Sequence, residues 1–238
     1  VKMSVLCKSI RPLPIVKEKE DEIFDAFSGK EQRYRNRHLD LILNPNVKET
    51  FIKRSQIIKS IRNFLDDLGF LEVETPVLQP IYGGANARPF TTYHNALDQK
   101  FFLRIADELY LKRLIIGGID RVYEIAKDFR NEGMDRNHNP EFTMLEFYWA
   151  YADYEDNMNL VEKMIRSAAK DIGAENLNWN NEDIDLSKDF KRIPFFEIIN
   201  ENIGQDISNL NFDELKKLCL TKGLNIETEE TYSQLLDK

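Results

Sequence analysis

Residues 121–151 read RVYEIAKDFRNEGMDRNHNPEFTMLEFYWAY, and this stretch decides the fold that we predict. Apolar and polar side chains alternate over residues 123–130 and again over residues 141–149, which is the period of a half-buried β-strand. Residues 131–139 between them gather Gly, Asp and three Asn before Pro140 closes the segment, a composition typical of a loop. The sequence therefore predicts two strands joined by a polar loop.

The second predicted strand has two chemically different faces, because successive side chains of a strand point to opposite sides. One face carries large apolar side chains that suit a core, at Leu145, Phe147 and Trp149. The other face carries an aromatic ring, a thioether, a carboxylate and a phenol, at Phe142, Met144, Glu146 and Tyr148. We expect the second face to line a site.

The loop that precedes this strand adds charged side chains at Arg130, Glu132, Arg136 and His138. An aromatic plane beside a carboxylate and several cations suits a nucleotide, with the ring for the base and the cations for the phosphates. The pattern is also compatible with a solvated hairpin tip on which Glu146 is an ordinary outward charge. The residues alone leave both interpretations open.

The hairpin and its loop also resemble a motif of a known enzyme family. Residues 129–154, FRNEGMDRNHNPEFTMLEFYWAYADY, resemble motif 2 of class II aminoacyl-tRNA synthetases, and specifically of the lysine enzymes. The aspartate and asparagine relatives share the FR…E frame and the PEFT, but lack the run RNEG…HNPEFT in this form. The resemblance is strong over residues 1–165 and faint over residues 166–238. It implies an α+β fold, a partial class II catalytic core with an antiparallel sheet flanked by helices.

Composition sets broader limits. The net charge of −8 argues against a dedicated nucleic-acid platform, since neutralising phosphates needs clustered Lys and Arg. Cys7 and Cys219 form no CxxC pattern, so neither a disulfide framework nor a structural zinc site is supported. No apolar run approaches the ~20 residues of a membrane span, and no signal peptide opens the chain. We predict a cytoplasmic protein without membrane contact.

The domain organisation is implied by the resemblance. Residues 1–15 alternate like one short strand, and KSIRPLP within them is similar to the segment that closes the N-terminal OB-type anticodon-binding barrel of the lysine enzymes. We assign residues 1–16 to the last strand of that barrel, residues 17–30 to a linker and residues 31–238 to the N-terminal part of the catalytic domain. The chain begins and stops inside predicted elements, which favours an internal portion of a larger protein.

Two amphipathic helices are predicted ahead of the hairpin. Residues 31–43 carry three arginines and His38 on a polar face, which could contact tRNA or a partner or be a salt-bridged surface. Residues 50–68 carry a wide apolar stripe, with Gly69 at the left-handed position that ends helices and a short strand closed by Pro76. This order resembles motif 1, at about residues 50–76, which forms the homodimer interface of class II synthetases. An ordinary core helix is the alternative.

The remaining elements follow from the same periodicities. In chain order they are a strand at 101–105, helices at 106–116, 154–172, 194–203 and 212–220, and the start of a last helix at 234. Residues 173–191 are polar and predict a loop or weak strand. Residues 154–238 should therefore be mainly helical.

The resemblance implies residues for an amino-acid site. In the loop QPIYGGANARPF the second glycine, Gly84, would meet the substrate ammonium. In the ELYLK segment Glu108 would pair with the α-ammonium of lysine, although a favourable helix dipole is also a sufficient reason for it. Glu146 and Tyr148 would face the lysine pocket, whose acidity fits a substrate with two ammonium groups. The chain departs from the family pattern at Tyr82, Asn86 and Asp107, where Pro, Ala and Pro are usual.

The resemblance also implies an ATP site. Arg130 would bind the α-phosphate and the lysine carboxylate and stabilise the pentacoordinate phosphorus. Glu132 would accept from the adenine amino group, and Phe142 would stack on adenine. Arg136 and His138 would meet the β- and γ-phosphates. No GxGxGxxR occurs, so motif 3 and the carboxylates that hold Mg²⁺ are expected outside this portion, which contains no metal ligands and should be inactive alone.

The predicted function is ATP-dependent activation of L-lysine to lysyl-adenylate and transfer to tRNA(Lys). Two alternatives stay open. One is a lysyl-transferase that acts on a translation elongation factor, a family that lacks the OB barrel. The other is a non-catalytic synthetase paralogue or dimerisation module, against which the intact set of Arg130, Glu132, Phe142 and Glu146 argues.

Overall fold

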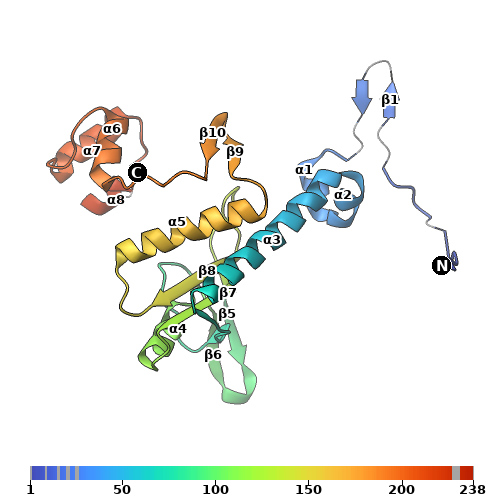
Figure 1. Cartoon of the computed structure of the whole chain (residues 1–238), viewed down its shortest axis with the longest axis horizontal. Helices are drawn as coiled ribbons and strands as arrows, with labels where there is room; N and C mark the ends of the chain where they lie inside the picture. The colour runs from blue at the N-terminus through green and yellow to red at the C-terminus, as the bar shows by residue number, and fades with distance from the viewer. Residues whose placement is uncertain are drawn as a thin grey trace. The chain divides into compact units, whose positions relative to one another are not determined.

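The computed structural model describes residues 2–8, 10–14, 17–19, 22–24, 27–226 and 231–237, with the backbone alone for residues 17–19 and 22–24. The chain divides into two compact units, Val1–Lys188 and Asp189–Lys238, which are taken one at a time. Figure 1 shows the course of the chain. The division falls inside the range 31–238 that we assigned to the catalytic domain, and the predicted domain limits stay predictions.

The predicted hairpin is confirmed and lies at the centre of the first unit. β7 (Arg121–Phe129) and β8 (Glu141–Trp149) pair antiparallel along their whole length. β3 (Leu71–Glu72) pairs with the other edge of β7 but runs parallel to it. The expectation of an antiparallel sheet was therefore only partly right. The long crossover between β3 and β7 permits parallel pairing, which a tight hairpin cannot make.

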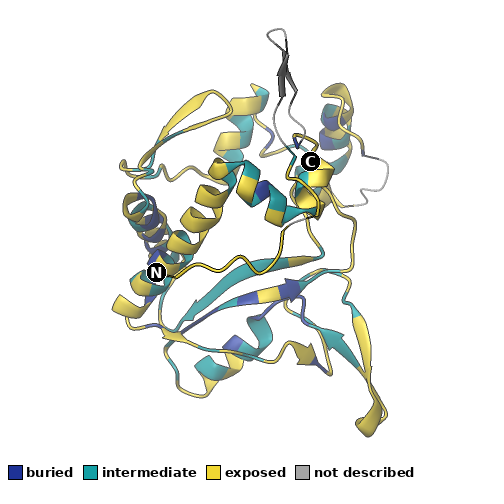
Figure 2. Ribbon diagram, turned by 90° about the vertical axis from the view of Figure 1, so that its right-hand side faces the viewer, coloured by how far each residue is buried: buried dark blue, intermediate teal, exposed yellow. Residues whose placement is uncertain are grey.

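The apolar face of the hairpin packs against two helices, α3 (Pro45–Asp67) and α5 (Tyr154–Asp171). The buried centre of this core consists of Leu65, Phe70, Tyr123, Leu160 and Met164, with Leu145, Phe147 and Trp149 packed against it. Figure 2 shows buried and half-buried residues along the strands and many exposed residues on the helices. The predicted assignment of the two faces of β8 is therefore confirmed.

Helix α3 begins earlier than predicted, and it ends close to the predicted position. It starts at Pro45, five residues before the expected start at residue 50, because a proline suits the first helical position, where no N–H is needed. At its end Gly69 has a φ of +78°, and its N–H donates to the Asp66 carbonyl over 2.9 Å. The Phe70 N–H donates to the Leu65 carbonyl over 3.0 Å, which completes the hydrogen-bond pair of a Schellman cap.

A second small sheet lies beside the hairpin. Its strand order is β4-β6-β5, with β4 (Leu78–Gln79) and β5 (Thr91–His94) each antiparallel to β6 (Gln99–Leu103). A 3₁₀ turn, η1 (Asn95–Leu97), joins β5 to β6. β6 leads into α4 (Glu108–Ile116), two residues shorter at its start than the predicted helix. This arrangement brings residues 104–108 up against the hairpin.

The structure near the N-terminus differs from the prediction. Residues 2–8 and 10–14 form no strand, so the predicted short strand is absent there. A strand needs a neighbouring strand for its backbone hydrogen bonds, and none of the strand pairs among the described residues includes these segments. The predicted linker contains two short antiparallel strands, β1 (Lys17–Lys19) and β2 (Glu22–Phe24). The OB-barrel assignment of residues 1–16 stays a prediction, and residues 1, 9, 15 and 16 of that range lie outside the described residues.

The helix predicted at residues 31–43 is two helices, α1 (Lys30–Arg35) and α2 (Arg37–Leu43), interrupted at Asn36. The buried Asp40 carboxylate accepts from Arg33 Nε over 2.7 Å and also pairs with Arg37. A third arginine, Arg35, pairs with Glu31 on the surface over 2.9 Å. These contacts support the salt-bridged alternative for this arginine-rich face.

After α5 the chain forms an antiparallel hairpin, β9 (Asn176–Trp179) and β10 (Glu182–Asp185), inside the segment predicted as loop or weak strand. The second unit holds α6 (Phe195–Ile203), α7 (Phe212–Thr221) and α8 (Tyr232–Leu236). Its own core comprises Ile207, Leu215, Cys219, Ile226 and Leu235. The mainly helical character expected beyond residue 154 is confirmed for the described residues.

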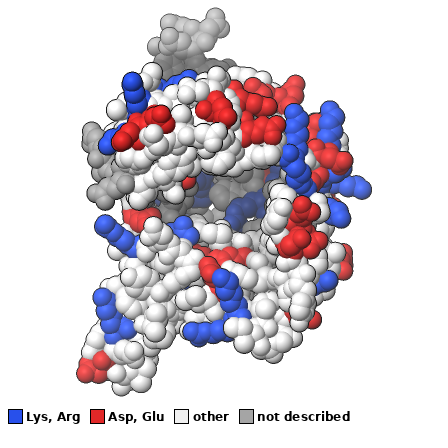
Figure 3. All heavy atoms as spheres, turned by 90° about the vertical axis from the view of Figure 1, so that its left-hand side faces the viewer, with Lys and Arg blue, Asp and Glu red and all other residues white. Residues whose placement is uncertain are grey.

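No helix within the described residues is both long and apolar enough to cross a membrane. Figure 3 shows acidic and basic side chains interspersed on one face of the molecule. The predicted cytoplasmic location stays a prediction.

Candidate functional site

The polar face of the β7–β8 hairpin forms the floor of the candidate site. Glu124 lies directly opposite Glu146 in the strand register, and Asp128 lies opposite Phe142. Tyr148 is on the same face, two residues beyond Glu146, to which its hydroxyl donates over 3.2 Å. Three carboxylates and a phenol therefore lie on one face, as the alternation of both strands requires.

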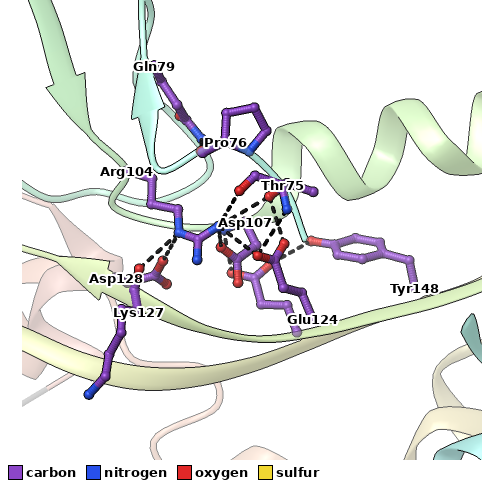
Figure 4. A network of polar contacts seen from close by, with 10 residues as sticks. Thr75, Pro76, Gln79, Arg104, Asp107, Glu124, Lys127, Asp128 and Tyr148 are labelled. Carbon is purple, nitrogen blue, oxygen red and sulfur yellow. Dashed lines mark hydrogen bonds and ion pairs between the residues drawn. The ribbon is translucent and has the colours of Figure 1, made fainter. Parts of the chain in front are cut away.

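A buried arginine lies against this polar face and pairs with its carboxylates. Arg104, which directly follows β6, is 3% exposed, and its guanidinium donates to Glu124 Oε1 over 2.8 Å and to the Lys127 carbonyl over 2.9 Å. The same side chain forms ion pairs with Asp107 at 3.1 Å and with Asp128 at 3.3 Å. Figure 4 shows the guanidinium at the centre of this network. Arg104 thus ties the end of β6 and the start of α4 to strand β7.

The network extends to the segment that follows β3. Thr75 donates to the Glu124 carboxylate twice, through its backbone N–H at 3.1 Å and its hydroxyl at 2.7 Å. Its carbonyl accepts from Arg104 over 3.2 Å. Glu124, which is 4% exposed, therefore has partners for both oxygens. Such full satisfaction is what a buried carboxylate requires.

The aspartates of this network have perturbed acidities. Burial and the neighbouring Asp128 charge raise the pKa of Asp107 to about 8, against the opposing effect of Arg104. Burial also raises the pKa of Asp128, to about 6, again against Arg104. The cause is a local excess of carboxylates over cations at side chains that are shielded from solvent. The backbone N–H of Asp107 also donates to Glu146 Oε1 over 3.2 Å.

The residues expected to bind lysine lie together. Glu108 is the first residue of α4, next to Asp107, and its carboxylate pairs with Lys112 one turn on. Burial, followed by the charges of Glu146 and Glu108, raises the pKa of Tyr148. Glu108, Glu146 and Tyr148 are all partly accessible. The structure thus brings together two carboxylates and a phenol from α4 and β8.

The loop expected over the amino-acid site approaches the same residues. Gly84 has a φ of +88°, and a Cβ atom placed on it would lie 2.9 Å from the Cβ of Glu108 and 3.2 Å from that of Ala106. Tyr82, one of the three departures, packs on Phe102 with ring centroids 4.8 Å apart. Glycine is needed at position 84 for both reasons, a left-handed backbone and a close approach.

Arg130 and Phe142 lie side by side at the loop end of the hairpin. The Arg130 guanidinium carbon is 5.1 Å from the centroid of the Phe142 ring, a cation–π geometry. Its Nε donates to the Ile105 carbonyl over 3.4 Å. This weak contact links Arg130 to the turn that carries Asp107. An arginine fork beside an open aromatic ring suits a nucleotide.

The three other loop residues are exposed. Glu132 accepts from the Arg88 N–H over 3.3 Å, which joins the loop to the segment containing Gly84. His138 contacts the Asp135 carboxylate through Nδ1 at 2.8 Å. Hydrogen bonds from the backbone of Asn137 and from His138 lower the pKa of Asp135. Arg136 and His138 therefore belong to the loop tip, and within the described residues no contact joins them to Arg130.

Several members of the site escaped the sequence analysis. Arg104, Glu124 and Asp128 received no role, and Asp107 was noted only as a departure. The signals were present: Glu124 and Asp128 fall on the Glu146 side of the hairpin by simple alternation, and Arg104 ends a predicted buried strand. A charge in a buried strand calls for a partner, and three carboxylates on one face call for a cation.

A divalent metal does not suit the buried carboxylates. One oxygen each of Asp107, Asp128 and Glu146 lies within 4.8 Å of the others, a spacing that a metal could bridge. The Arg104 guanidinium, however, already pairs with both aspartates. A second cation of higher charge would have to bind next to it. We therefore assign no Mg²⁺ ligands here, and no step below depends on the ion.

Comparisons with known proteins identify related sequences. Residues 29–231 match the family model described as tRNA synthetases class II (D, K and N). The chain is 51% identical over 230 residues to the lysine–tRNA ligase of Porphyromonas gingivalis strain ATCC BAA-308 / W83. It is equally similar, at 51% over 230 residues, to the lysine–tRNA ligase of strain ATCC 33277 of the same species. The match covers 96% of this chain but only 39% of each relative.

Proposed function

The chain belongs to the family of class II tRNA synthetases (D, K and N), and from this premise we propose that it carries the lysine- and ATP-binding part of a lysine–tRNA ligase. The observation that carries the choice of lysine is an acidic cluster, in which Glu108 and Glu146 lie beside Tyr148 and further carboxylates lie on the same face of the hairpin. An amino acid with two ammonium groups matches an acidic pocket better than aspartate or asparagine does. The named relatives agree with this choice.

In the proposed complex the pocket binds lysine at both ends. Glu108 pairs with the α-ammonium, and the backbone of Gly84 passes close enough to contact the same group. Glu146 and Tyr148 face the lysine side chain, with the phenol hydroxyl already donating to Glu146. The close contact of Gly84 with Glu108 supports this arrangement, because it brings the loop against the carboxylate.

ATP would bind along the loop end of the hairpin. Phe142 stacks on adenine and Glu132 accepts from its amino group, while Arg130 binds the α-phosphate. Arg136 and His138 meet the β- and γ-phosphates when the exposed loop closes over them. The Arg130–Phe142 contact supports the first part, since it places a fork of donors next to an aromatic plane.

The proposed reaction joins two anions, so positioning and charge neutralisation supply most of the catalysis. A carboxylate oxygen of lysine attacks the α-phosphorus of ATP. The bond between that phosphorus and the leaving pyrophosphate oxygen breaks, and lysyl-adenylate and pyrophosphate form. Arg130 stabilises the added negative charge on the phosphorus, and no protein base is needed. The hydroxyl at the end of tRNA(Lys) then displaces AMP.

Lysine-dependent ATP–pyrophosphate exchange, measured beside calorimetric lysine binding, tests the proposal. Lysine should bind to this chain, and arginine and ornithine should bind at least about tenfold more weakly, because removing one buried charged contact costs ~1.5–3 kcal/mol. Exchange in the presence of lysine would show that the described residues suffice for adenylation. A folded chain that binds none of the three amino acids would contradict the proposal.

We also propose that α3 and the segment after it contact a second copy of the chain. Phe51, Ile52, Leu71 and Leu78 are each at least 44% exposed. Phe51 and Ile52 also line a shallow groove with Leu41. Apolar side chains that gather at the surface, as Phe51, Ile52 and Leu41 do around this groove, mark an interaction surface more often than scattered ones do. The partner proposed is identical because the family pattern of motif 1, at about residues 50–76, covers Phe51, Ile52 and Leu71.

An elongation factor is the alternative acceptor for the activated lysine. The two acceptors share the adenylation site, so the residues above do not separate them. Transfer assays in which tRNA(Lys) and an elongation factor compete for the activated lysine can distinguish the two acceptors. We propose tRNA, because the KSIRPLP segment is similar to the end of an anticodon-binding barrel.

A further inference from the structure

The turn between β6 and α4 and the facing strand β7 each contribute one carboxylate to a buried pair that the proposed chemistry does not use. Asp107 and Asp128 are both 0% exposed. None of their side-chain oxygens accepts a hydrogen bond from any residue that the structure describes, although both form ion pairs with Arg104. Buried carboxylate oxygens without a donor are costly, and native structures rarely leave them so.

The charges around this pair do not balance. Arg104 is shared among Asp107, Asp128 and Glu124, so one guanidinium faces three carboxylates. Among the described residues, the charged or titratable groups that act on the pair are Arg104 after β6, Glu124 on β7 with Arg130 beyond its end, and Glu146 and Tyr148 on β8. Glu108, the residue after Asp107, adds another carboxylate next to Tyr148. The acids outnumber the cations. One proton held between the aspartates would remove a negative charge and supply the missing donor.

Asp107 also contacts the lysine pocket directly. Its backbone N–H donates to Glu146 Oε1 over 3.2 Å, while Tyr148 donates to the other oxygen over 3.2 Å. These two donors fix the orientation of the Glu146 carboxylate. A proline at position 107 has no N–H and could not make the first bond.

We propose that Asp107 is a positioning residue of the lysine pocket, which holds a proton shared with Asp128 and orients Glu146 through its backbone N–H. This proposal rests on the proposed function for the identity of the ligand. The raised pKa values of both aspartates agree with it. Asp107 carries the proton at neutral pH and donates it in a hydrogen bond to the ionised Asp128.

The shared proton couples lysine binding to pH. An ammonium group that enters the pocket stabilises negative charge, so it favours loss of the proton from Asp107. By linkage, lysine affinity rises with pH while the proton is still present in the free protein. The limit for one released proton is about a tenfold rise in affinity per pH unit.

The first test needs no ligand. In a ¹³C NMR titration of the aspartate-labelled chain, one carboxyl should titrate above pH 7, and Asp107→Asn should remove that transition. Asp98→Asn is the matched control, since Asp98 is exposed and its φ of +50° suits asparagine. The shared proton is excluded if every aspartate of the wild-type chain titrates below pH 6. It is equally excluded if millimolar Mg²⁺ shifts the Asp107 and Asp128 signals, because a cation site would then explain the pair.

The second test measures lysine binding by calorimetry at pH 6.5 and pH 8. Wild type and Asp98→Asn should bind more tightly at the higher pH, and Asp107→Asn should lose most of that gain. Asp107→Pro should bind more weakly at both pH values. Equal pH dependence in wild type and Asp107→Asn would overturn the coupling. A folded wild-type chain that binds no lysine would overturn the proposed function and the pocket role of Asp107, while the titration still decides the shared proton.

Discussion

The Cα of Gly84 approaches α4 so closely that a methyl group on it would lie 2.9 Å from the Cβ of Glu108. The loop of Gly84 and the first turn of α4 are 24 residues apart in sequence and meet at the one carboxylate that we place on the α-ammonium of lysine. The left-handed backbone of Gly84, with a φ of +88°, makes this approach possible.

Gly84→Ala should weaken lysine binding by more than tenfold, because the new methyl group must displace the loop or Glu108. Gly118→Ala is the matched control: its φ of +95° imposes the same backbone strain, but no atom lies within 4 Å of the added carbon. Gly118→Ala should lose about 1 kcal/mol of stability, and Gly84→Ala should lose more because of the added clash. Equal lysine affinities in the two variants would show that the contact with Glu108 has no role.

Glu146→Gln should lower lysine affinity about tenfold or more, since a charged hydrogen bond is worth ~1.5–3 kcal/mol. Glu141→Gln makes the same change on the same strand, but Glu141 is exposed and its only ion pair, among the described residues, is with Lys127 at 3.7 Å. The control should bind lysine like the wild type. Calorimetry at constant pH measures both. An unchanged affinity in Glu146→Gln would contradict the assignment of this carboxylate to the pocket.

The periodicity of apolar residues was sufficient to predict the hairpin, the assignment of its side chains to a core face and a polar face, and most helices. These features depend on which side chains a single element must bury. Phe142, Glu146 and Tyr148 were placed correctly on the face opposite Leu145 and Trp149. The predicted start of α3 was five residues late, because Pro45 serves as the first helical residue.

The buried network could not be derived from one segment at a time. Arg104, Asp107 and Glu124 come from different elements, and no single stretch of sequence indicates that these three side chains pair with one another. Only the packing of the β6–α4 turn against β7 makes them neighbours. The short strand predicted near the N-terminus was wrong for a different reason. Alternation of side chains favours a strand, but a strand forms only when another strand pairs with its backbone, and no strand pair among the described residues includes this segment.

Arg104→Met should destabilise the first unit by about 3–5 kcal/mol, because it leaves buried carboxylates without their cation. Arg62→Met is the control, since the Arg62–Glu72 pair at 2.9 Å is partly exposed and should contribute less than about 1 kcal/mol. Urea unfolding followed by tryptophan fluorescence can measure both, because Trp149 packs against the core of this unit. A loss below 1 kcal/mol in Arg104→Met would mean that the network contributes little to stability.

Ile52→Glu should shift the chain from dimer to monomer without unfolding it, because Ile52 is 48% exposed on α3. Ile116→Glu introduces the same charge at a residue that is 85% exposed at the end of α4, and should leave the association unchanged. Sedimentation velocity over a range of protein concentrations can distinguish the two. A wild-type chain that stays monomeric at high micromolar concentration would rule out the proposed contact for this chain.

The pH dependence of stability should reveal the proton on Asp107. Folding raises the pKa of this carboxyl to about 8 from its ordinary 3.8. Between these values the folded chain holds a proton that the unfolded chain has lost, so stability falls as pH rises, by up to about 1.4 kcal/mol per pH unit. Below the ordinary value both states are protonated, and the dependence disappears.

The most informative window runs from pH 6.5 to pH 8, above the raised pKa of Asp128, which is about 6. There, urea unfolding should give a stability that decreases with pH in wild type and in Asp98→Asn. Asp107→Asn should be nearly flat, because asparagine preserves the shape of the side chain but has no proton to lose. The histidines are common to all three proteins, so their titration cancels in the comparison. A slope in Asp107→Asn equal to that of wild type would place the responsible proton elsewhere.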